Sequence, residues 1–238
     1  MVWVAGVDGC RAGWIAVFHD MTSGAIVVRL VERFVEMLEA PERPRIVAVD
    51  MPIGLLDAAQ PGGRGPESDL RRLLARAGRA SCVFTPPVRA ALAAPSYRAA
   101  NRVNRASSAD RLGLSKQSYN LIPKLAELDA SMTRARQARI FEAHPEFAFA
   151  LMNGGDPLAA PKKTGEGFRR RVELLRRHGF GEAANAACAF ARRDAMPDDV
   201  LDAAAVARTA LRILRDEAVR FPARPPRDSR GLRMEVWG

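Results

Sequence analysis

Short apolar runs that end on an acidic residue are the clearest pattern in the chain. Val2 to Phe18 contains two such runs joined by a tight glycine-rich turn, and the first run stops on Asp8. Arg45 to Asp50 and Gln137 to Glu142 repeat the pattern. Runs this short and apolar predict strands that are covered on both faces, as in a sheet with helices packed on it.

Strand and helix patterns alternate in the first 50 residues and again in the last 100 or so. Ala25 to Val31 predicts a further strand, and apolar residues at helical spacing predict a helix before Pro41, giving the order β-β-β-α-β. Later segments predict helices at about 146–152, 168–177 and 197–215, then a last strand over 232–237.

The alternation stops between these two parts. Two amphipathic helices are predicted there, one from about Pro66 to Gly78 and one around Leu121 to Met132. We therefore expect an α/β fold with a mixed sheet: three antiparallel strands first, then parallel strands, flanked by helices. We expect a single domain, with a core of about 1–51 and 137–238 and a basic helical insertion of about 52–136.

The acids at the strand ends are the first candidates for chemistry. Aspartate is depleted from strands, so Asp8 either caps the Asp-Gly turn or holds a ligand. Neighbouring strands lie roughly 5 Å apart, so strands ending at one sheet edge would place Asp8, Asp50 and Glu142 close together. Like charges at that spacing predict a bound cation.

A late helix that opens at Pro197 supplies further acids. Asp199 and Asp202 are three residues apart, so their side chains share one helix face. Acids in a first turn also cap a helix and complement its dipole, which Asp198 alone could do. Asp202 lies a turn further on among alanines, where an acid without a function is unexpected.

Composition narrows the class of protein. The 238 residues are 48% hydrophobic, enough for a folded core, and no apolar run reaches the length needed to span a membrane. The three cysteines are far apart and lack metal-binding or redox spacing. We expect a cytoplasmic protein with no membrane association, and the sequence does not indicate its oligomeric state.

Positive charge is concentrated in the predicted insertion. The net charge is +10, and the stretch from Pro61 to Arg111 holds ten arginines against three acidic residues. Arginine binds phosphate in a two-pronged way, which predicts nucleic acid as the partner, although an arginine-rich composition alone would give part of this excess. Few aromatic residues favour duplex or structured nucleic acid over single strands. The candidate phosphate-binding residues are Arg11, Arg71, Arg72, Arg76, Arg79 and Lys116.

Several phrases of the sequence resemble a known family. They are Val-Asp-Gly-Cys-Arg-Ala-Gly-Trp, Ala-Val-Asp-Met-Pro-Ile-Gly-Leu, Glu-Ala-His-Pro-Glu and Asp-Asp-Val-Leu-Asp-Ala, with Cys-Val-Phe-Thr-Pro and Ser-Lys-Gln in the insertion. They are similar to the prokaryotic domain-of-unknown-function family 429, described as predicted nucleases. The late Asp-x-x-Asp helix resembles the resolvase branch of the ribonuclease H-like superfamily.

The resemblance implies roles for the acids. Asp8 would be shared between two metal ions, Asp50 or Glu142 would be the second strand acid, and Asp202, with or without Asp199, would be the helix acid. Both alternatives for the second strand acid stay open, because Asp50 could instead belong to a substrate loop.

The chemistry expected from such a site is hydrolysis of phosphodiester bonds with two Mg²⁺ or Mn²⁺ ions. His144 could transfer a proton or orient a ligand, although a histidine before proline is more often structural. Two alternatives remain, a phosphotransferase of the sugar-kinase and actin type and a nucleic-acid-binding module without catalysis.

Overall fold

The structure is a computed structural model that describes residues 1–238, and the chain forms two compact units. The sheet unit consists of Met1–Met51, Ala138–Val219 and Trp237–Gly238. The helical unit consists of Pro52–Gln137 and Arg220–Val236. Each unit is described by itself.

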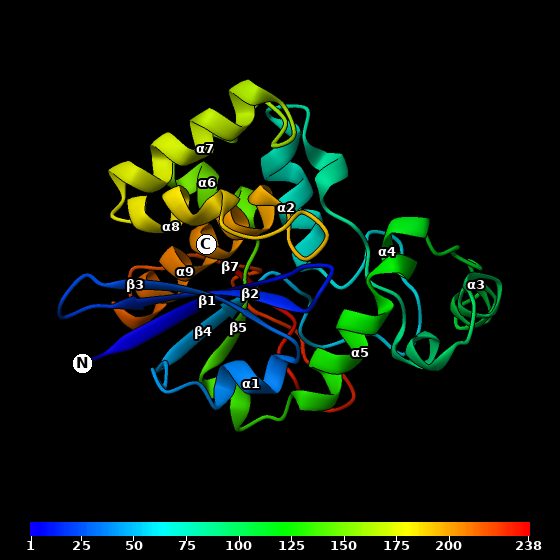
Figure 1. The fold of residues 1–238 in the computed structure, drawn as a ribbon. Coiled ribbons are helices and arrows are strands. Elements are labelled where there is room, and N and C mark those ends of the chain that lie inside the picture. Colours follow the sequence, from blue (N-terminus) through cyan, green and yellow to red (C-terminus); the bar gives the residue numbers. More distant parts are fainter. The chain divides into compact units, whose positions relative to one another are not determined.

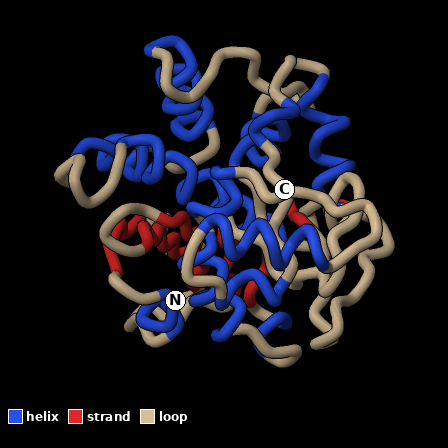
Figure 2. Tube along the Cα trace, turned by 90° about the vertical axis from the view of Figure 1, so that its right-hand side faces the viewer, coloured by secondary structure: helices blue, strands red, loops and turns tan.

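A five-stranded mixed sheet is the centre of the sheet unit (Figure 1). The order is β3-β2-β1-β4-β5, and β3, β2 and β1 are antiparallel while β1, β4 and β5 are parallel. In the view turned by a right angle, these strands gather in one group (Figure 2). This confirms the predicted α/β class and is consistent with a ribonuclease H-like arrangement. The strands are β1 (Trp3–Gly9), β2 (Trp14–Asp20), β3 (Ile26–Val31), β4 (Ile46–Val49) and β5 (Ile140–Glu142).

Helices cover both faces of this sheet. Figure 1 shows α6, α7 and α8 on the side where α9 packs, and α1 on the other side, where Phe34 contacts Trp14 of β2 edge to face. The helices of the unit are α1 (Phe34–Leu38), α6 (Pro145–Met152), α7 (Gly165–Arg177), α8 (Gly181–Asn185), the 3-10 turn η4 (Ala186–Cys188) and α9 (Pro197–Leu214).

The glycine in the middle of β1 lets α9 lie directly on the sheet. A Cβ atom at Gly6 would lie 2.1 Å from the backbone nitrogen of Ala207 and 2.2 Å from the carbonyl oxygen of Ala203. Residues two apart in a strand share a face, so Asp8 faces the same helix as Gly6. The small residues of α9 and Gly6 therefore allow the short distance between the helix and the strand that carries Asp8.

Replacing Gly6 with alanine is expected to destabilise the protein by about 3 kcal/mol or more, because the methyl group meets backbone atoms that no rotamer change can move aside. Chemical denaturation of the purified variant measures this change. The control is Gly24→Ala in the β2–β3 turn, where a Cβ atom meets nothing within 4 Å. Its positive φ angle predicts a smaller loss from backbone strain alone. Equal losses in both variants would contradict the close packing of α9.

The helical unit has a separate small core, formed by Val88, Ala91, Ala100, Leu114 and Ile122. Two of its helices, α3 and α4, lie where the sequence pattern predicted no element. The elements of 52–137 are α2 (Pro66–Ala75), η1 (Ala80–Cys82), η2 (Arg89–Ala93), α3 (Tyr97–Ala106), α4 (Lys116–Asn120), α5 (Ile122–Ser131) and η3 (Arg136–Ala138).

The segment 220–236 belongs to the helical unit, whereas the sequence assigned it to the core. Arg89 forms ion pairs with Asp129 and Asp228, and the side chain of Gln137 hydrogen-bonds the backbone of Arg233 in both directions. These partners occupy backbone groups that a strand ladder would need. The predicted last strand is therefore reduced to β7 (Val236–Trp237), which pairs with β6 (Arg220–Phe221).

Two predictions from composition can be compared with the structure. None of the helices has both the length and the apolar character required to cross a membrane. Cys10, Cys82 and Cys188 are all free thiols.

Candidate metal centre

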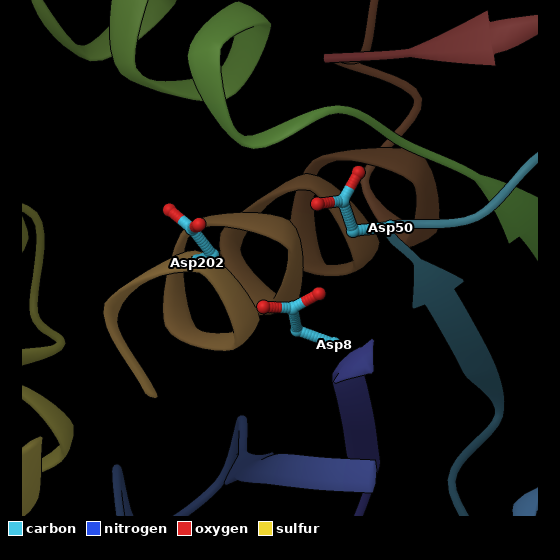
Figure 3. Close-up of side chains that lie close together, drawn as sticks. All are labelled: Asp8, Asp50 and Asp202. Carbon is cyan, nitrogen blue, oxygen red and sulfur yellow. The ribbon is translucent and has the colours of Figure 1, made fainter. Parts of the chain in front are cut away.

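Three aspartates from three different elements converge at one end of the sheet. Asp8 is the last residue but one of β1, Asp50 follows β4 and Asp202 lies in the second turn of α9. Their carboxylates lie close together (Figure 3). One oxygen of each lies within 4.8 Å of the other two. The sequence predicted five acids as metal ligands, and the structure brings three of them together in this group.

Parallel pairing of β1 and β4 places Asp50 next to Asp8. Gly6 pairs with Ala48, and the backbone N–H of Asp50 donates a hydrogen bond of 2.9 Å to the carbonyl oxygen of Val7. The register continues to the strand ends, so both carboxylates lie on the face that α9 covers.

Asp202 reaches the cluster because α9 approaches β1 so closely. It directly precedes Ala203, whose carbonyl oxygen lies over Gly6. Its side chain points back toward the helix N-terminus, which is the end nearest Asp8. Asp202 is only 3% exposed, and the alanines that follow it in α9 are also buried. Its carboxylate is therefore shielded from solvent.

Glu142 lies outside the group of three aspartates, although its charge contributes to raising the pKa of Asp50, and its predicted part as a metal ligand stays a prediction. In the β4–β5 pairing Glu142 lies opposite Val49, and Ala143 therefore lies at the level of Asp50. Neighbouring residues of a strand point to opposite faces, so Glu142 lies on the face away from α9. Of the two alternatives for the second strand acid, the geometry favours Asp50.

Asp199 and His144 have capping contacts. The Asp199 carboxylate accepts a hydrogen bond of 2.8 Å from the backbone N–H of Met196 and so caps α9. The Nδ1 atom of His144 accepts one of 3.2 Å from the backbone N–H of Glu146 at the start of α6. These contacts fit the structural alternative for both residues, and their predicted parts in metal binding and proton transfer stay predictions.

Burial and mutual repulsion make the cluster electrostatically unfavourable without a cation. Burial, and then the charges of Asp50 and Asp202, raise the pKa of Asp8 well above its usual value. Burial likewise raises the pKa of Asp50 and of Asp202, and it raises the pKa of Asp199 to about 6. Neither Asp8 nor Asp50 accepts a hydrogen bond, although Asp8 is only 8% exposed.

Lys162 is the functional residue that the sequence did not reveal. Its ammonium group lies 2.5 Å from Oδ2 of Asp202 and 3.3 Å from Oδ2 of Asp198. The charge of Asp202 raises the pKa of Lys162, which keeps the ammonium group positive. Lys162 is therefore the cation that compensates the aspartate cluster within the chain itself.

A buried ion pair holds the segment that carries Lys162. The guanidinium of Arg171 is fully buried, binds both oxygens of Glu146 at 2.7 and 2.8 Å, and donates to the carbonyl oxygen of Ala160. Gly167 lets the same segment lie against α7, since a Cβ atom there would meet the carbonyl oxygen of Pro161 at 2.0 Å. These contacts fix the backbone two residues before Lys162.

The predicted phosphate-binding residues lie in both units. Arg11 is exposed in the β1–β2 turn, three residues after Asp8, and the other five belong to the helical unit. Arg72 is exposed and pairs with Asp69 at 3.1 Å, while the ammonium group of Lys116 lies 4.2 Å from the ring centre of Tyr97. Arg76 is exposed and Arg79 is half-buried.

The guanidinium of Arg71 forms three hydrogen bonds within the helical unit. It donates to the carbonyl oxygens of Val83 and Gly62 and to the hydroxyl of Thr85. These bonds fix the position of the guanidinium, and the predicted part of Arg71 in binding phosphate stays a prediction.

The donor set of the cluster fits a hard cation. Three carboxylates offer only oxygen ligands, the type that Mg²⁺, Mn²⁺ and Ca²⁺ prefer, and there is no histidine or thiolate among them to favour zinc or copper. Asp8 is buried and Asp50 is half-buried, and both lack a hydrogen-bond donor, so they are the groups that such a cation would satisfy. The cluster of Asp8, Asp50 and Asp202 could therefore hold a metal ion.

The segment of the chain that matches a known protein family includes the whole site. A family model described as "Protein of unknown function (DUF429)" matches residues 6–227 of the 238. The match begins before Asp8 and extends past the end of α9, so it includes all three aspartates and Lys162. No curated protein and no solved structure matches the chain. Because the family model matches well over half of its length, the chain belongs to the family described as "Protein of unknown function (DUF429)".

Proposed function

We propose that this protein is a metal-dependent nuclease that hydrolyses phosphodiester bonds in nucleic acid. The observation that carries the proposal is the convergence of Asp8, Asp50 and Asp202, with ligand oxygens within 4.8 Å of one another. Clustered carboxylates of this kind hold cations for phosphoryl transfer without a nucleophilic side chain.

The proposed occupants are two Mg²⁺ or Mn²⁺ ions. Asp8 would be the ligand that the two ions share, as the family resemblance implies, and its ligand oxygen lies within 4.8 Å of one from Asp50 and one from Asp202. Asp50 would then complete one ion site and Asp202 the other. Bound there, such ions supply activation of water and stabilisation of negative charge on the phosphoryl oxygens.

The residues around the cluster would orient and tune these ligands. Lys162 donates to Asp202 and would compensate its charge while no ion is bound. Arg11 lies exposed in the turn that begins after Asp8, where a phosphate of the substrate could be bound. Asp199 holds the first turn of α9 in place through the backbone of Met196.

A phosphotransferase is less well supported. It would need a glycine-rich loop for adenosine, and the Gly154–Gly155 pair is a poor substitute for such a loop. Both glycines have positive φ angles, and their backbone N–H groups donate to the carbonyl oxygens of Leu151 and Ala150. They end α6 in the manner of a helix C-cap, which explains them without a nucleotide.

The α3 helix offers a surface for nucleic acid. Arg98, Arg102 and Arg105 follow one another at helical spacing on one face, all are exposed, and none forms an ion pair. Arg64 and Arg89, by contrast, are engaged with acids of the helical unit. We propose that this face of α3 binds phosphates of duplex or structured nucleic acid.

Replacing Arg98, Arg102 and Arg105 together with glutamine is expected to weaken nucleic-acid binding and flatten its salt dependence. Each phosphate contact contributes about 0.9 to the slope of log affinity against log salt on duplex DNA, so the slope should fall by roughly one to three. Fluorescence anisotropy with a labelled duplex, in EDTA and at several salt concentrations, measures the slope.

The matched control replaces Arg169, Arg176 and Arg177 of α7 with glutamine. These arginines are also exposed, and their replacement removes the same amount of positive charge. Arg171 is unsuitable because it is fully buried against Glu146. If the control lowers the slope as much as the α3 variant, binding follows net charge alone and α3 is not the binding surface.

The test of the proposed activity compares the wild type with Asp202→Asn on a panel of duplex DNA, RNA–DNA hybrid and structured RNA. Cleavage is expected with Mn²⁺ or Mg²⁺, none in EDTA, and a loss of orders of magnitude in the variant, because a metal ligand is removed. Asp110→Asn, an exposed acid in the helical unit, is the control.

Three outcomes would contradict the nuclease proposal. Cleavage that persists in EDTA or in Asp202→Asn would place the activity elsewhere. Metal-dependent consumption of ATP without cleavage would favour the phosphotransferase. Binding of nucleic acid without cleavage under any metal condition would favour a module without catalysis.

A further inference from the structure

The helical unit contains a pocket that the metal centre does not explain. Its volume is about 320 Å³, within the range of small-molecule sites, and all the residues that line it belong to 52–137. Two phrases of the sequence that are far apart meet there, Val83 to Pro86 and Ser115 with Gln117. These are the insertion phrases that support the family resemblance, and the proposed cleavage chemistry gives them no role.

The pocket carries one uncompensated positive charge. Its lining contains Arg64 and Arg71 but no acidic residue. Arg64 is buried and neutralised by Glu67, which accepts hydrogen bonds from two of its nitrogens. Arg71 forms no ion pair, because its acceptors are two carbonyl oxygens and the hydroxyl of Thr85.

The guanidinium of Arg71 is held ready for an anion. Three of its five N–H donors are used by Gly62, Val83 and Thr85, which leaves two donors on a group whose position is already fixed. Holding the group in advance reduces the entropy that binding would otherwise cost. A phosphate is a ligand that accepts such a pair of donors well.

The rest of the lining suits a flat, partly apolar group. Phe84 lies between the two residues that hold Arg71 and lines the pocket together with the Pro86–Pro87 pair. The amide of Gln117 is exposed at the pocket and has no hydrogen-bond partner in the chain. An aromatic ring, an apolar wall and a free amide are the groups that recognise a nucleobase.

We propose that this pocket binds a single nucleotide, with its phosphate at Arg71 and its base between Phe84 and Gln117. The proposal deepens the proposed nuclease function and rests on it for the source of the nucleotide, an end or an unpaired position of a substrate strand. A free mononucleotide has the same chemistry, so the test includes both sources.

The test measures binding by calorimetry in EDTA, which prevents cleavage. Adenosine 5′-monophosphate and uridine 5′-monophosphate are expected to bind at least about tenfold more tightly than adenosine or inorganic phosphate, because only a nucleotide fills both parts of the pocket. A pentanucleotide with a 5′-phosphate, compared with the same strand lacking it, shows whether a strand end enters.

Three variants address the pocket. Arg71→Lys keeps the charge but loses the two-pronged geometry, Phe84→Leu keeps apolar volume but loses the ring, and Gln117→Ala removes the amide. Each is expected to weaken nucleotide binding by about tenfold or more. The matched control is Arg192→Gln, an exposed arginine of the sheet unit that lies outside the pocket lining. Thermal unfolding checks that each variant is folded.

Asp8→Asn separates this proposal from the proposed function. It removes the metal centre, so it should abolish cleavage and leave mononucleotide affinity unchanged. Absence of mononucleotide binding in the wild type, or equal binding by all the pocket variants and the wild type, would overturn the nucleotide pocket whatever the result of the cleavage assay. Nucleotide binding without any nuclease activity would overturn the proposed function alone.

Discussion

Replacing Asp8 with asparagine is expected to remove Mn²⁺ binding and yet raise the stability of the metal-free protein. Asp8 has no hydrogen-bond donor, is nearly buried and is repelled by Asp50 and Asp202. Loss of its charge removes both the shared ligand and the repulsion. Calorimetric titration with Mn²⁺ measures the first effect, and thermal unfolding in EDTA measures the second.

The stability gain has a defined pH dependence. The folded-state pKa of Asp8 is raised, so its ionisation begins to cost stability as pH rises past the unfolded-state value of about 3.9, and the cost is complete above the folded-state pKa. Asparagine does not titrate. The variant should therefore match the wild type near pH 4 and exceed it at neutral pH.

Added Mn²⁺ should reverse the order of stability. An ion at 100 times its dissociation constant stabilises the folded state by about 2.7 kcal/mol, which corresponds to roughly 5–10 °C for a chain of this length. That shift is expected for the wild type and for the control Asp110→Asn, and it should be absent in Asp8→Asn. Unchanged Mn²⁺ affinity in Asp8→Asn would eliminate the aspartate cluster as the metal site.

Replacing Lys162 with glutamine is expected to destabilise the metal-free protein and to strengthen metal binding. The ammonium group compensates Asp202 in the absence of metal, and its removal leaves buried carboxylates without a cation. The side chain is 32% exposed, so we expect a loss of about 2 kcal/mol, less than for a fully buried pair. A cation that competes with Mn²⁺ is removed, so the Mn²⁺ affinity should rise by about tenfold.

Lys163→Gln is the matched control, since the neighbouring lysine is exposed and has no acidic partner. Thermal unfolding in EDTA gives the stability of the metal-free protein, and the rise in melting temperature with added Mn²⁺ gives the change in metal affinity. A weaker affinity for Mn²⁺ in Lys162→Gln would show that Lys162 positions Asp202 as a ligand and does not compete with the ion.

Local patterns were sufficient for the main elements of the sheet unit. The runs that end on Asp8 and Asp50 are strands, and the helix from Pro197 carries Asp202 among alanines, as their periodicity predicted. A strand that is buried on both faces is apolar at nearly every position, so a polar residue is expected only where the strand ends. Two residues of the metal-site candidate, Asp8 and Asp50, followed from that exception.

The choice between Asp50 and Glu142 required the sheet. Both end apolar runs, and in sequence they look alike. Pairing register decides the face on which a side chain lies, and a difference of one residue reverses it, so Glu142 opposite Val49 points away from α9. Register depends on contacts between strands that are far apart in the chain, and no local pattern contains it.

The sequence by itself therefore determined the α/β class, Asp8 and Asp202 as candidate ligands, and the excess of positive charge in 52–136. The tertiary structure alone decided that Lys162 neutralises the aspartates, because its position depends on Gly167 and Arg171, which hold the preceding backbone. It also decided that Arg71 lines a pocket instead of an open surface, since Val83 and Thr85 accept its hydrogen bonds. A charged residue looks the same in sequence whether or not it has a partner, and the partner is supplied by the fold.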